Sequence, residues 1–268
     1  MPRETLPLFD VSGRVAMVTG GGSGLGREFC EILAEFGADI VCSDLHKNRA
    51  EETCEMIKKY GYRTLAIEVD VTKYDQVQAM FKQLEGTLGR LDILINNAGI
   101  TTISPVIDQM ELEDWHKVLD VNLHGVFYCM KEGLRIMMKR KKGSIINIAS
   151  VVGQYGIDPD IMSTAHYVAS KSGVIGLTKQ GAAEYGRHGI RVNCISPGWH
   201  LGTGLAGSES SKEQRKEFKQ LLSLKTPMKR TGEPQELKGL LLYLASDASS
   251  FVTGQIIAHD GGWNCWRC

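Results

Sequence analysis

The sequence lacks any long apolar run, and no stretch of its 268 residues approaches the length that a helix needs to cross a bilayer. Its first ten residues also lack the apolar centre of a secretory signal peptide. We therefore expect a cytoplasmic protein with no membrane partner. Net charge is absent as well, because 31 basic residues balance 31 acidic ones. With no global field to attract nucleic acid, we predict no nucleic-acid partner, and any ligand must be recognised locally.

The seven cysteines lack the spacing of a zinc site or a disulfide framework. The only close pair, Cys265 and Cys268, forms a C-x-x-C at the end of the sequence, without the two further ligands that zinc requires or the helix that a redox motif requires. We therefore predict reduced thiols, no metal and a tail pair without function. The basic run 139–142 lies before Gly143 at the end of a helical pattern, which favours helix capping over an anion site.

No linker rich in proline or serine divides the chain, and no internal repeat is visible, which predicts a single domain over residues 1–268. Short β-branched runs alternate with helical patterns, as in an α/β fold. The expected strands are 15–19, 39–43, 64–69, 91–96, 144–148, 191–195 and 255–258, and the expected helices are 25–36, 49–59, 74–85, 113–138, 166–185 and 235–245. The strands are continuously apolar, so we predict one doubly wound, Rossmann-like domain whose seven-stranded parallel sheet is covered by helices on both faces. The glycine-rich, polar region 199–226 is predicted to be a substrate lid.

A glycine-rich turn joins the first expected strand to the first expected helix, over residues 19–26. Glycines let the backbone approach a pyrophosphate, and the following helix start supplies free N–H groups and a positive dipole end. Asp44 follows about twenty residues later, at the end of the second strand, where an acidic side chain binds the adenosine ribose. The carboxylate would repel a 2′-phosphate, and Ser23 offers no charge to hold one, so we predict NAD as the cofactor. His46, Lys47 and Arg49 lie near enough to keep NADP as an alternative.

Tyr167 and Lys171 are four residues apart and project from one face of a helix. Oxidising an alcohol requires a base, and the pKa of free tyrosine near 10 is about three units too high, a gap of roughly 4 kcal/mol. One ammonium at about 4 Å supplies on the order of 4 kcal/mol at an effective dielectric near 20. We therefore expect Lys171 to lower the pKa of Tyr167 almost enough for proton transfer at neutral pH.

The ordered series of these motifs resembles the short-chain dehydrogenase/reductase family, in its ordinary-length branch, over residues 8–263. The series comprises Thr19-Gly20-x-x-x-Gly24-x-Gly26, Asp70-Val71, Asn96-Asn97-Ala98-Gly99, Asn122, Ser150, Tyr167-x-x-x-Lys171, Pro197-Gly198 and Asp260-Gly261-Gly262. The resemblance implies a catalytic set of Asn122, Ser150, Tyr167 and Lys171. It implies cofactor contacts at Gly20, Ser23, Gly24, Leu25, Gly26, Asp44, Asp70, Val71, Asn97, Ala98, Gly99, Tyr167, Lys171, Pro197, Gly198 and Thr203.

The resemblance also assigns roles. Tyr167 is the general base in oxidation and the general acid in reduction, and Lys171 lowers its pKa and binds the nicotinamide ribose. Ser150 holds the substrate oxygen, and Asn122 supports a proton relay through water. Two departures bear on the substrate: the seventeen positions between Ser150 and Tyr167 enlarge a loop at 154–164, and the usual threonine after Pro197-Gly198 is displaced to Thr203.

The opening residues 8–13 resemble NAD-dependent sugar-acid and polyol dehydrogenases, so we expect a secondary alcohol or ketone of that class as the small-molecule substrate. Two alternatives stay open: a 3-oxoacyl-carrier-protein reductase, which shares these motifs, and a regulatory protein that binds NAD without turnover. The resemblance further implies a homotetramer built on the helices that carry Asn122 and Tyr167. Trp263, Cys265 and Trp266 would then line a pocket or form a free tail.

Overall fold

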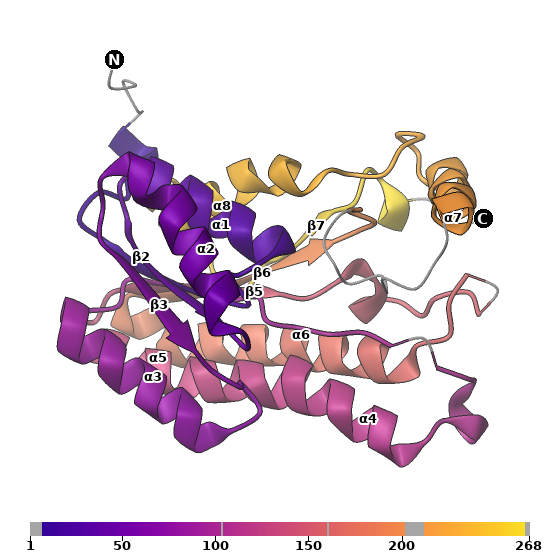
Figure 1. The fold of residues 1–268 in the computed structure, drawn as a ribbon, viewed down its shortest axis with the longest axis horizontal. Helices are drawn as coiled ribbons and strands as arrows, with labels where there is room; N and C mark the ends of the chain where they lie inside the picture. The colour runs from indigo at the N-terminus through magenta and orange to yellow at the C-terminus, as the bar shows by residue number, and fades with distance from the viewer. Residues whose placement is uncertain (1–6, 103, 160, 202–211, 266–268) are drawn as a thin grey trace.

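The computed structural model describes residues 7–102, 104–159, 161–201 and 212–265 of the chain. Seven parallel strands form one sheet in the order β3-β2-β1-β4-β5-β6-β7 (Figure 1). Their bounds are β1 Val15–Thr19, β2 Asp39–Asp44, β3 Thr64–Glu68, β4 Ile93–Asn96, β5 Gly143–Ile148, β6 Ile190–Pro197 and β7 Ile256–His259. The strand order reverses between β1 and β4, which is the switch point where doubly wound sheets bind their ligands.

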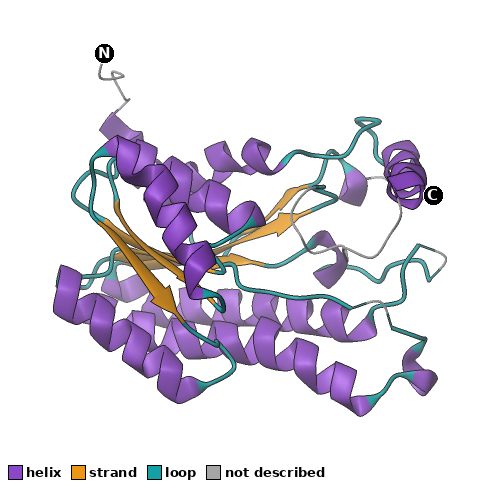
Figure 2. Ribbon diagram, in the orientation of Figure 1, coloured by secondary structure: helices purple, strands orange, loops and turns teal. Residues whose placement is uncertain are grey.

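Helices cover both faces of the sheet, as predicted (Figure 2). On one face lie α3 Tyr74–Leu88, α4 Leu112–Leu119, α5 Gly125–Arg140 and α6 Ala165–Tyr185. On the other lie α1 Gly24–Glu35, α2 Lys47–Ile57 and α8 Lys238–Ala245. The described part of the chain thus confirms the predicted α/β architecture.

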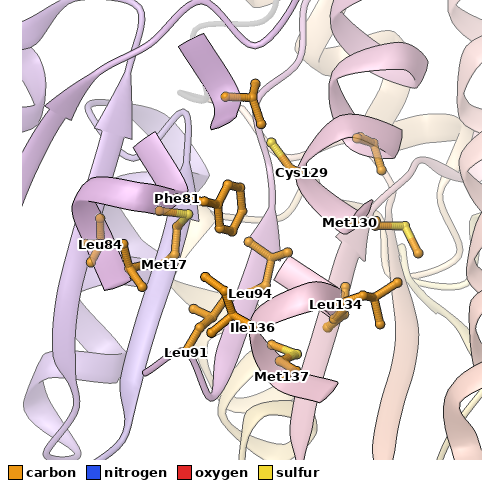
Figure 3. Close-up of a cluster of buried hydrophobic side chains, with 14 of the residues drawn as sticks. Met17, Phe81, Leu84, Leu91, Leu94, Cys129, Met130, Leu134, Ile136 and Met137 are labelled. Carbon is orange, nitrogen blue, oxygen red and sulfur yellow. The ribbon is translucent and has the colours of Figure 1, made fainter. Parts of the chain in front are cut away.

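Alternate residues of each strand enter two separate cores. Val15 and Met17 of β1 pack with α3, α5 and α6, whereas Ala16 and Val18 pack with α1, α2 and α8. Figure 3 shows the first core, in which Phe81 of α3 faces the methionine-rich side of α5. This double burial explains why the central strands are largely apolar, since neither face of the sheet meets water there, whereas the edge strands β3 and β7 are partly exposed.

The predicted helix 113–138 is interrupted in the structure. Helix α4 ends at Leu119, a π-helical turn spans Asp120–His124, and α5 continues from Gly125. A π-turn inserts one extra residue into the helix, and such insertions occur frequently at functional sites. Here the turn carries Asn122, which is fully buried. The apolar periodicity runs through the turn, so the interruption is not visible in the sequence.

The predicted lid region is described only in part. Residues 199–201 follow β6, and helix α7 spans Lys212–Lys225. Trp199 contacts Phe218 of α7 with ring centroids 5.8 Å apart, and His200 forms a parallel bridge with Gly232. Thr203 lies outside the described residues, as do Trp266 and Cys268. Closure of this region over a substrate stays a prediction.

Six of the seven cysteines lie in the described residues, and all six are free thiols. Cys265 alone among these six is exposed. Within the described residues, no helix combines the length and apolar character needed to cross a membrane. The same part of the chain holds no cluster of three His, Cys, Asp or Glu side chains that could bind a metal ion.

Candidate active site

The ends of β1 and β4 are joined by hydrogen bonds at the switch point. Thr19 Oγ1 accepts the backbone N–H groups of Asn97 and Ala98, each at 3.1 Å. The Asn97 side-chain amide donates to the carbonyl oxygens of Thr19 at 2.9 Å and Gly20 at 3.1 Å. These contacts hold the first half of the glycine loop against the segment that follows β4, so two of the predicted cofactor segments form one surface.

The glycine loop is too crowded for side chains. A Cβ added to Gly20, whose φ is +62°, would lie 2.9 Å from the Ala98 Cα, and one on Gly26 would lie 2.1 Å from the Gly20 carbonyl oxygen. Ser23 is the N-cap of α1, and its side chain makes no capping hydrogen bond. The first N–H groups of α1, around Gly24 and Leu25, therefore remain available to an anionic ligand. The loop fits a dinucleotide pyrophosphate in both shape and hydrogen-bonding capacity.

Asp44 ends β2 directly beside this loop. Its carboxylate is 7% exposed and accepts backbone N–H groups from Gly22 and His46, each at 3.0 Å. A Cβ on Gly22 would meet Asp44 Oδ2 at 2.7 Å and Arg49 Cβ at 2.6 Å, so the start of the Arg49 side chain lies close to the acid. The site therefore offers a fixed negative charge, with the Arg27 guanidinium donating to the Gly22 carbonyl at 2.6 Å and the base of the Arg49 side chain close by.

The segment after β3 is also fixed close to the switch point. Asp70 accepts both the N–H and the hydroxyl of Thr72, at 2.9 and 2.8 Å, and its own N–H donates to Gln76. Val71 is buried against Gly125 at the start of α5, where a Cβ would come within 2.9 Å of the valine side chain. The predicted cofactor contacts at Asp70 and Val71 thus lie on an ordered turn at the carboxyl end of the sheet.

Ser150, Tyr167 and Lys171 come together where β5 meets α6. Ser150 follows β5, and its hydroxyl lies beside the Tyr167 phenol, where it accepts the Val152 N–H at 3.4 Å. The Lys171 ammonium lies 5.5 Å from the centroid of the Tyr167 ring and donates to the Ile148 carbonyl oxygen at 2.8 Å. Lys171 is 3% exposed, whereas Tyr167 is half-buried. The structure thus brings three of the four predicted catalytic side chains into one cluster.

Burial, and not the neighbouring charge, controls the pKa of both groups in this cluster. Desolvation raises the pKa of Tyr167 to about 12, although the neighbouring Ser150 hydroxyl acts to lower it. Desolvation also lowers the pKa of Lys171 to about 8. In the cofactor-free protein, burial therefore opposes the expected effect of Lys171 on the pKa of Tyr167, and the lowering of that pKa in the presence of cofactor stays a prediction. The ammonium is directed to the Ile148 carbonyl, and the loss of hydration outweighs its attraction for a phenolate.

Asn122 completes the predicted set from the π-turn. Its carboxamide oxygen accepts the Ile100 N–H and its amide donates to the Ile100 carbonyl, both at 2.8 Å, and it also donates to Ser170 on α6 at 3.2 Å. A Cβ on Gly99 would lie 3.3 Å from Asn122 Oδ1 and 3.4 Å from Lys171 Nζ. Asn122 and Lys171 therefore flank the same glycine, next to the predicted cofactor residues Asn97 and Ala98.

Pro197 and Gly198 end β6 beside the last strand. The Gly198 N–H donates to the His259 carbonyl at 3.0 Å, and a Cβ on Gly198 would lie 2.7 Å from the Asp260 side chain. Trp263 stacks edge-on against Trp199, with centroids 5.6 Å apart. The 3-10 turn Trp263–Cys265 therefore packs beside the 197–201 segment through the contact between Trp263 and Trp199. This turn contains two of the three predicted tail residues.

Sequence reasoning missed two residues of the site. His166 precedes Tyr167 and is fully buried, and its ring contacts the Thr102 hydroxyl at 2.8 Å. These residues are separated by 64 positions, and neither belongs to a motif. Only the three-dimensional structure brings them together.

A parallel sheet with a glycine loop at its switch point, and a half-buried tyrosine and a buried lysine beside it, defines a dinucleotide-binding oxidoreductase. Comparison with known proteins makes the class specific. Residues 20–264 match the family model described as Enoyl-(Acyl carrier protein) reductase. The chain is 38% identical to a 3-oxoacyl-[acyl-carrier-protein] reductase from Staphylococcus aureus, over 92% of this chain and 96% of that protein.

Two solved structures are similar over almost their whole length. A short-chain type dehydrogenase/reductase from Mycobacterium marinum has a TM-score of 0.90 and 38% identity, with 97% of this chain and 98% of that chain covered. A gluconate 5-dehydrogenase from Burkholderia cenocepacia, in complex with NADP and tartrate, has a TM-score of 0.88 and 35% identity, with 97% and 99% covered. The chain belongs to the short-chain dehydrogenase/reductase family.

Proposed function

We propose that this oxidoreductase is an NAD-dependent dehydrogenase that interconverts a secondary alcohol and its ketone, with a sugar, sugar acid or polyol as the substrate. The observation that carries the proposal is the cluster of Ser150, Tyr167 and Lys171, in which the serine hydroxyl lies beside the phenol and the ammonium lies 5.5 Å from the centroid of its ring. Asn122 and Lys171 meet beside Gly99, so the cluster adjoins the segment that is tied to the glycine loop.

In the oxidation, Ser150 holds the substrate hydroxyl oxygen and Tyr167 removes its proton as the C–H hydrogen leaves with both bonding electrons. When bound, NAD would supply the acceptor for this hydride, and its oxidised nicotinamide ring would supply a positive charge near Tyr167 that the hydride then neutralises. The products are a ketone, the reduced cofactor and one proton, which passes from Tyr167 to solvent through the relay that Asn122 supports. In the reverse direction Tyr167 donates the proton and Ser150 polarises the carbonyl.

The raised pKa of Tyr167 sets a requirement for this chemistry. A phenol with a pKa of about 12 is a weak base at neutral pH, so oxidation needs more positive charge near the phenolate than the protein alone provides. Reduction has no such requirement, because the protonated phenol is the acid. We therefore expect proton release from Tyr167 to be coupled to binding of the oxidised cofactor.

Asp44 supports NAD as the cofactor. Its carboxylate is held by two backbone N–H groups at the end of β2, where it can accept hydrogen bonds from ribose hydroxyls and repels a 2′-phosphate. NADP is a second candidate, because Arg49 lies beside Asp44 and the similar gluconate 5-dehydrogenase was crystallised with NADP. Comparing kcat/KM for NADH and NADPH with one ketone tests the choice, and equal values would contradict the preference for NAD.

The substrate class is supported by the similarity to a gluconate 5-dehydrogenase. A 3-oxoacyl-carrier-protein reductase is the alternative activity, supported by the 38% identity to the Staphylococcus aureus enzyme. A panel of sugars, sugar acids, polyols and hydroxysteroids with NAD, beside a 3-oxoacyl thioester with NADPH, separates the two by absorbance at the reduced nicotinamide band. Tight NADH binding without turnover on any of them would instead favour a non-catalytic NAD-binding regulator.

We also propose that the protein assembles as a homotetramer through the helices that carry Asn122 and Tyr167. Phe127 on α5 is 47% exposed, and Leu112 on α4 is 72% exposed, so this face offers apolar side chains to a second copy. Light scattering after gel filtration measures the mass directly. A monomeric mass at micromolar concentration would contradict the assembly.

A further inference from the structure

His166 is the buried side chain whose role the proposed chemistry leaves unexplained. It lies in the first turn of α6, directly before Tyr167, and its ring is fully inaccessible to solvent. Both ring nitrogens have partners. Nδ1 lies 2.7 Å from the Tyr167 backbone nitrogen, and Nε2 lies 2.8 Å from the Thr102 hydroxyl oxygen.

These two contacts determine the protonation state of the imidazole. A backbone N–H can only donate, so Nδ1 must accept the Tyr167 N–H with its lone pair. A neutral imidazole with an accepting Nδ1 carries its proton on Nε2, so Nε2–H donates to Thr102 Oγ1. Protonating Nδ1 would remove the acceptor and bury a cation.

The Thr102 contact connects His166 to the segment that also holds Asn122. Ile100 forms two backbone hydrogen bonds with the Asn122 carboxamide, and the Thr101 hydroxyl lies 3.3 Å from that of Thr164, just before α6. Residues 100–102 are thus bound on one side to the π-turn and on the other to the start of α6. We call these three residues the bridging segment.

We propose that His166 is a positioning residue, which holds the bridging segment against the start of α6 and thereby fixes Tyr167 relative to Asn122. The inference rests on the proposed function for its catalytic consequence. The geometry supports this role because one rigid ring connects the Tyr167 main chain to the Thr102 hydroxyl. Thr102 is two residues from Ile100, which is hydrogen-bonded to Asn122. A side chain with no hydrogen-bonding group, such as phenylalanine, cannot make this connection.

Protonation should release the bridging segment at low pH. Burial lowers the pKa of His166 below its ordinary value of 6.5, whereas the Thr164 backbone and the Asp114 carboxylate on α4 act in the opposite direction. The neutral form is therefore the folded form, and the unfolded chain binds the proton more readily. Stability and alignment are retained above pH 6.5 and are lost as the pH falls below it.

Hydrogen exchange tests the bridging segment without any substrate. In His166→Phe, which keeps the ring but removes both nitrogens, we expect at least tenfold faster exchange of the Ile100 and Ser104 amides, which donate to Asn122 and to the Ser163 carbonyl. His166→Gln keeps a donor near the Nε2 position and should exchange within threefold of the native protein. The matched control is His188→Phe at the other end of α6. Unchanged exchange in His166→Phe would overturn the proposal.

Kinetics test the catalytic consequence. We expect His166→Phe to lower kcat at least tenfold while the dissociation constant for NADH stays within twofold, with most of kcat restored in His166→Gln. In the native enzyme kcat should fall below pH 6.5, and in His166→Gln this acid limb should be weakened. If His166→Phe does not fold, Thr102→Val removes the same hydrogen bond from the other end and should give the same two effects.

The two readouts keep the outcomes separate. Faster exchange with native kcat would mean that His166 anchors the bridging segment without positioning Tyr167, which refutes the positioning role. No turnover by the native enzyme on the whole substrate panel would refute the proposed function, whereas the exchange experiment would still decide whether His166 holds the bridging segment.

Discussion

Replacing Asp44 with asparagine should change the cofactor preference more than any other single substitution. Asparagine keeps the shape of the side chain but loses its charge and one of its two acceptor oxygens. A hydrogen bond to a charged group contributes about 1.5–3 kcal/mol, so losing one to the adenosine ribose should weaken NADH about 10- to 150-fold. Two unit charges at about 4 Å interact by about 1 kcal/mol in water. Removing the repulsion between the Asp44 carboxylate and a doubly charged 2′-phosphate should therefore favour NADPH binding by about 2 kcal/mol, or roughly 30-fold.

The assay is the ratio of kcat/KM for NADH to that for NADPH, measured with one ketone at constant ionic strength. Asp44→Asn should lower this ratio on the order of a thousandfold, the product of both effects. It should also destabilise the fold by about 1–3 kcal/mol, because either Gly22 or His46 loses its acceptor. Arg49→Ala is the matched control, since removing the cation should raise the ratio. An unchanged ratio in Asp44→Asn would show that this carboxylate does not contact the ribose.

Two further predictions follow from crowding and burial. Gly26→Ala should lower the melting temperature by several degrees and weaken NADH binding, because the added Cβ would lie 2.1 Å from the Gly20 carbonyl oxygen. The control is Gly86→Ala, at an open position on α3, which should change neither the melting temperature nor NADH binding. The cofactor-free protein should become more stable as the pH rises from about 8 toward 10.5. Burial lowers the pKa of Lys171 in the folded protein to about 8, so in this range the unfolded chain binds more protons than the folded one. Thermal unfolding across that range should show the gain in the native protein and not in Lys171→Met, and an equal gain in both would refute the assignment.

Most of the fold could be predicted from the sequence because the central strands β1, β2, β4, β5 and β6 are buried on both faces. Val15–Thr19 was predicted at its observed bounds, since all five residues are apolar or buried and a glycine loop ends the strand. The break at Asp120–His124 could not be predicted, because a π-turn is stabilised by the contacts of Asn122 with Ile100, and these residues belong to different elements.

The candidate site was predictable where a motif is local in the chain. The glycine loop, Asp44 and the Tyr167-Lys171 pair lie where their spacing indicates. The pKa of Tyr167 was not predictable, because a charge four residues away is visible in the sequence and the desolvation that opposes it is not. His166 was missed for a similar reason, since its partner Thr102 is reached only through the folded chain.

The account depends most directly on Tyr167 as the group that transfers the proton. Tyr167→Phe removes only the hydroxyl, and general acid–base catalysis contributes roughly 10²- to 10⁴-fold to a rate. With an active substrate from the panel, kcat for Tyr167→Phe should fall by about that factor while NADH binds as it does to the native enzyme, and Tyr185→Phe at the end of the same helix should keep its activity. Oxidation by Tyr167→Phe at the native rate would contradict the mechanism.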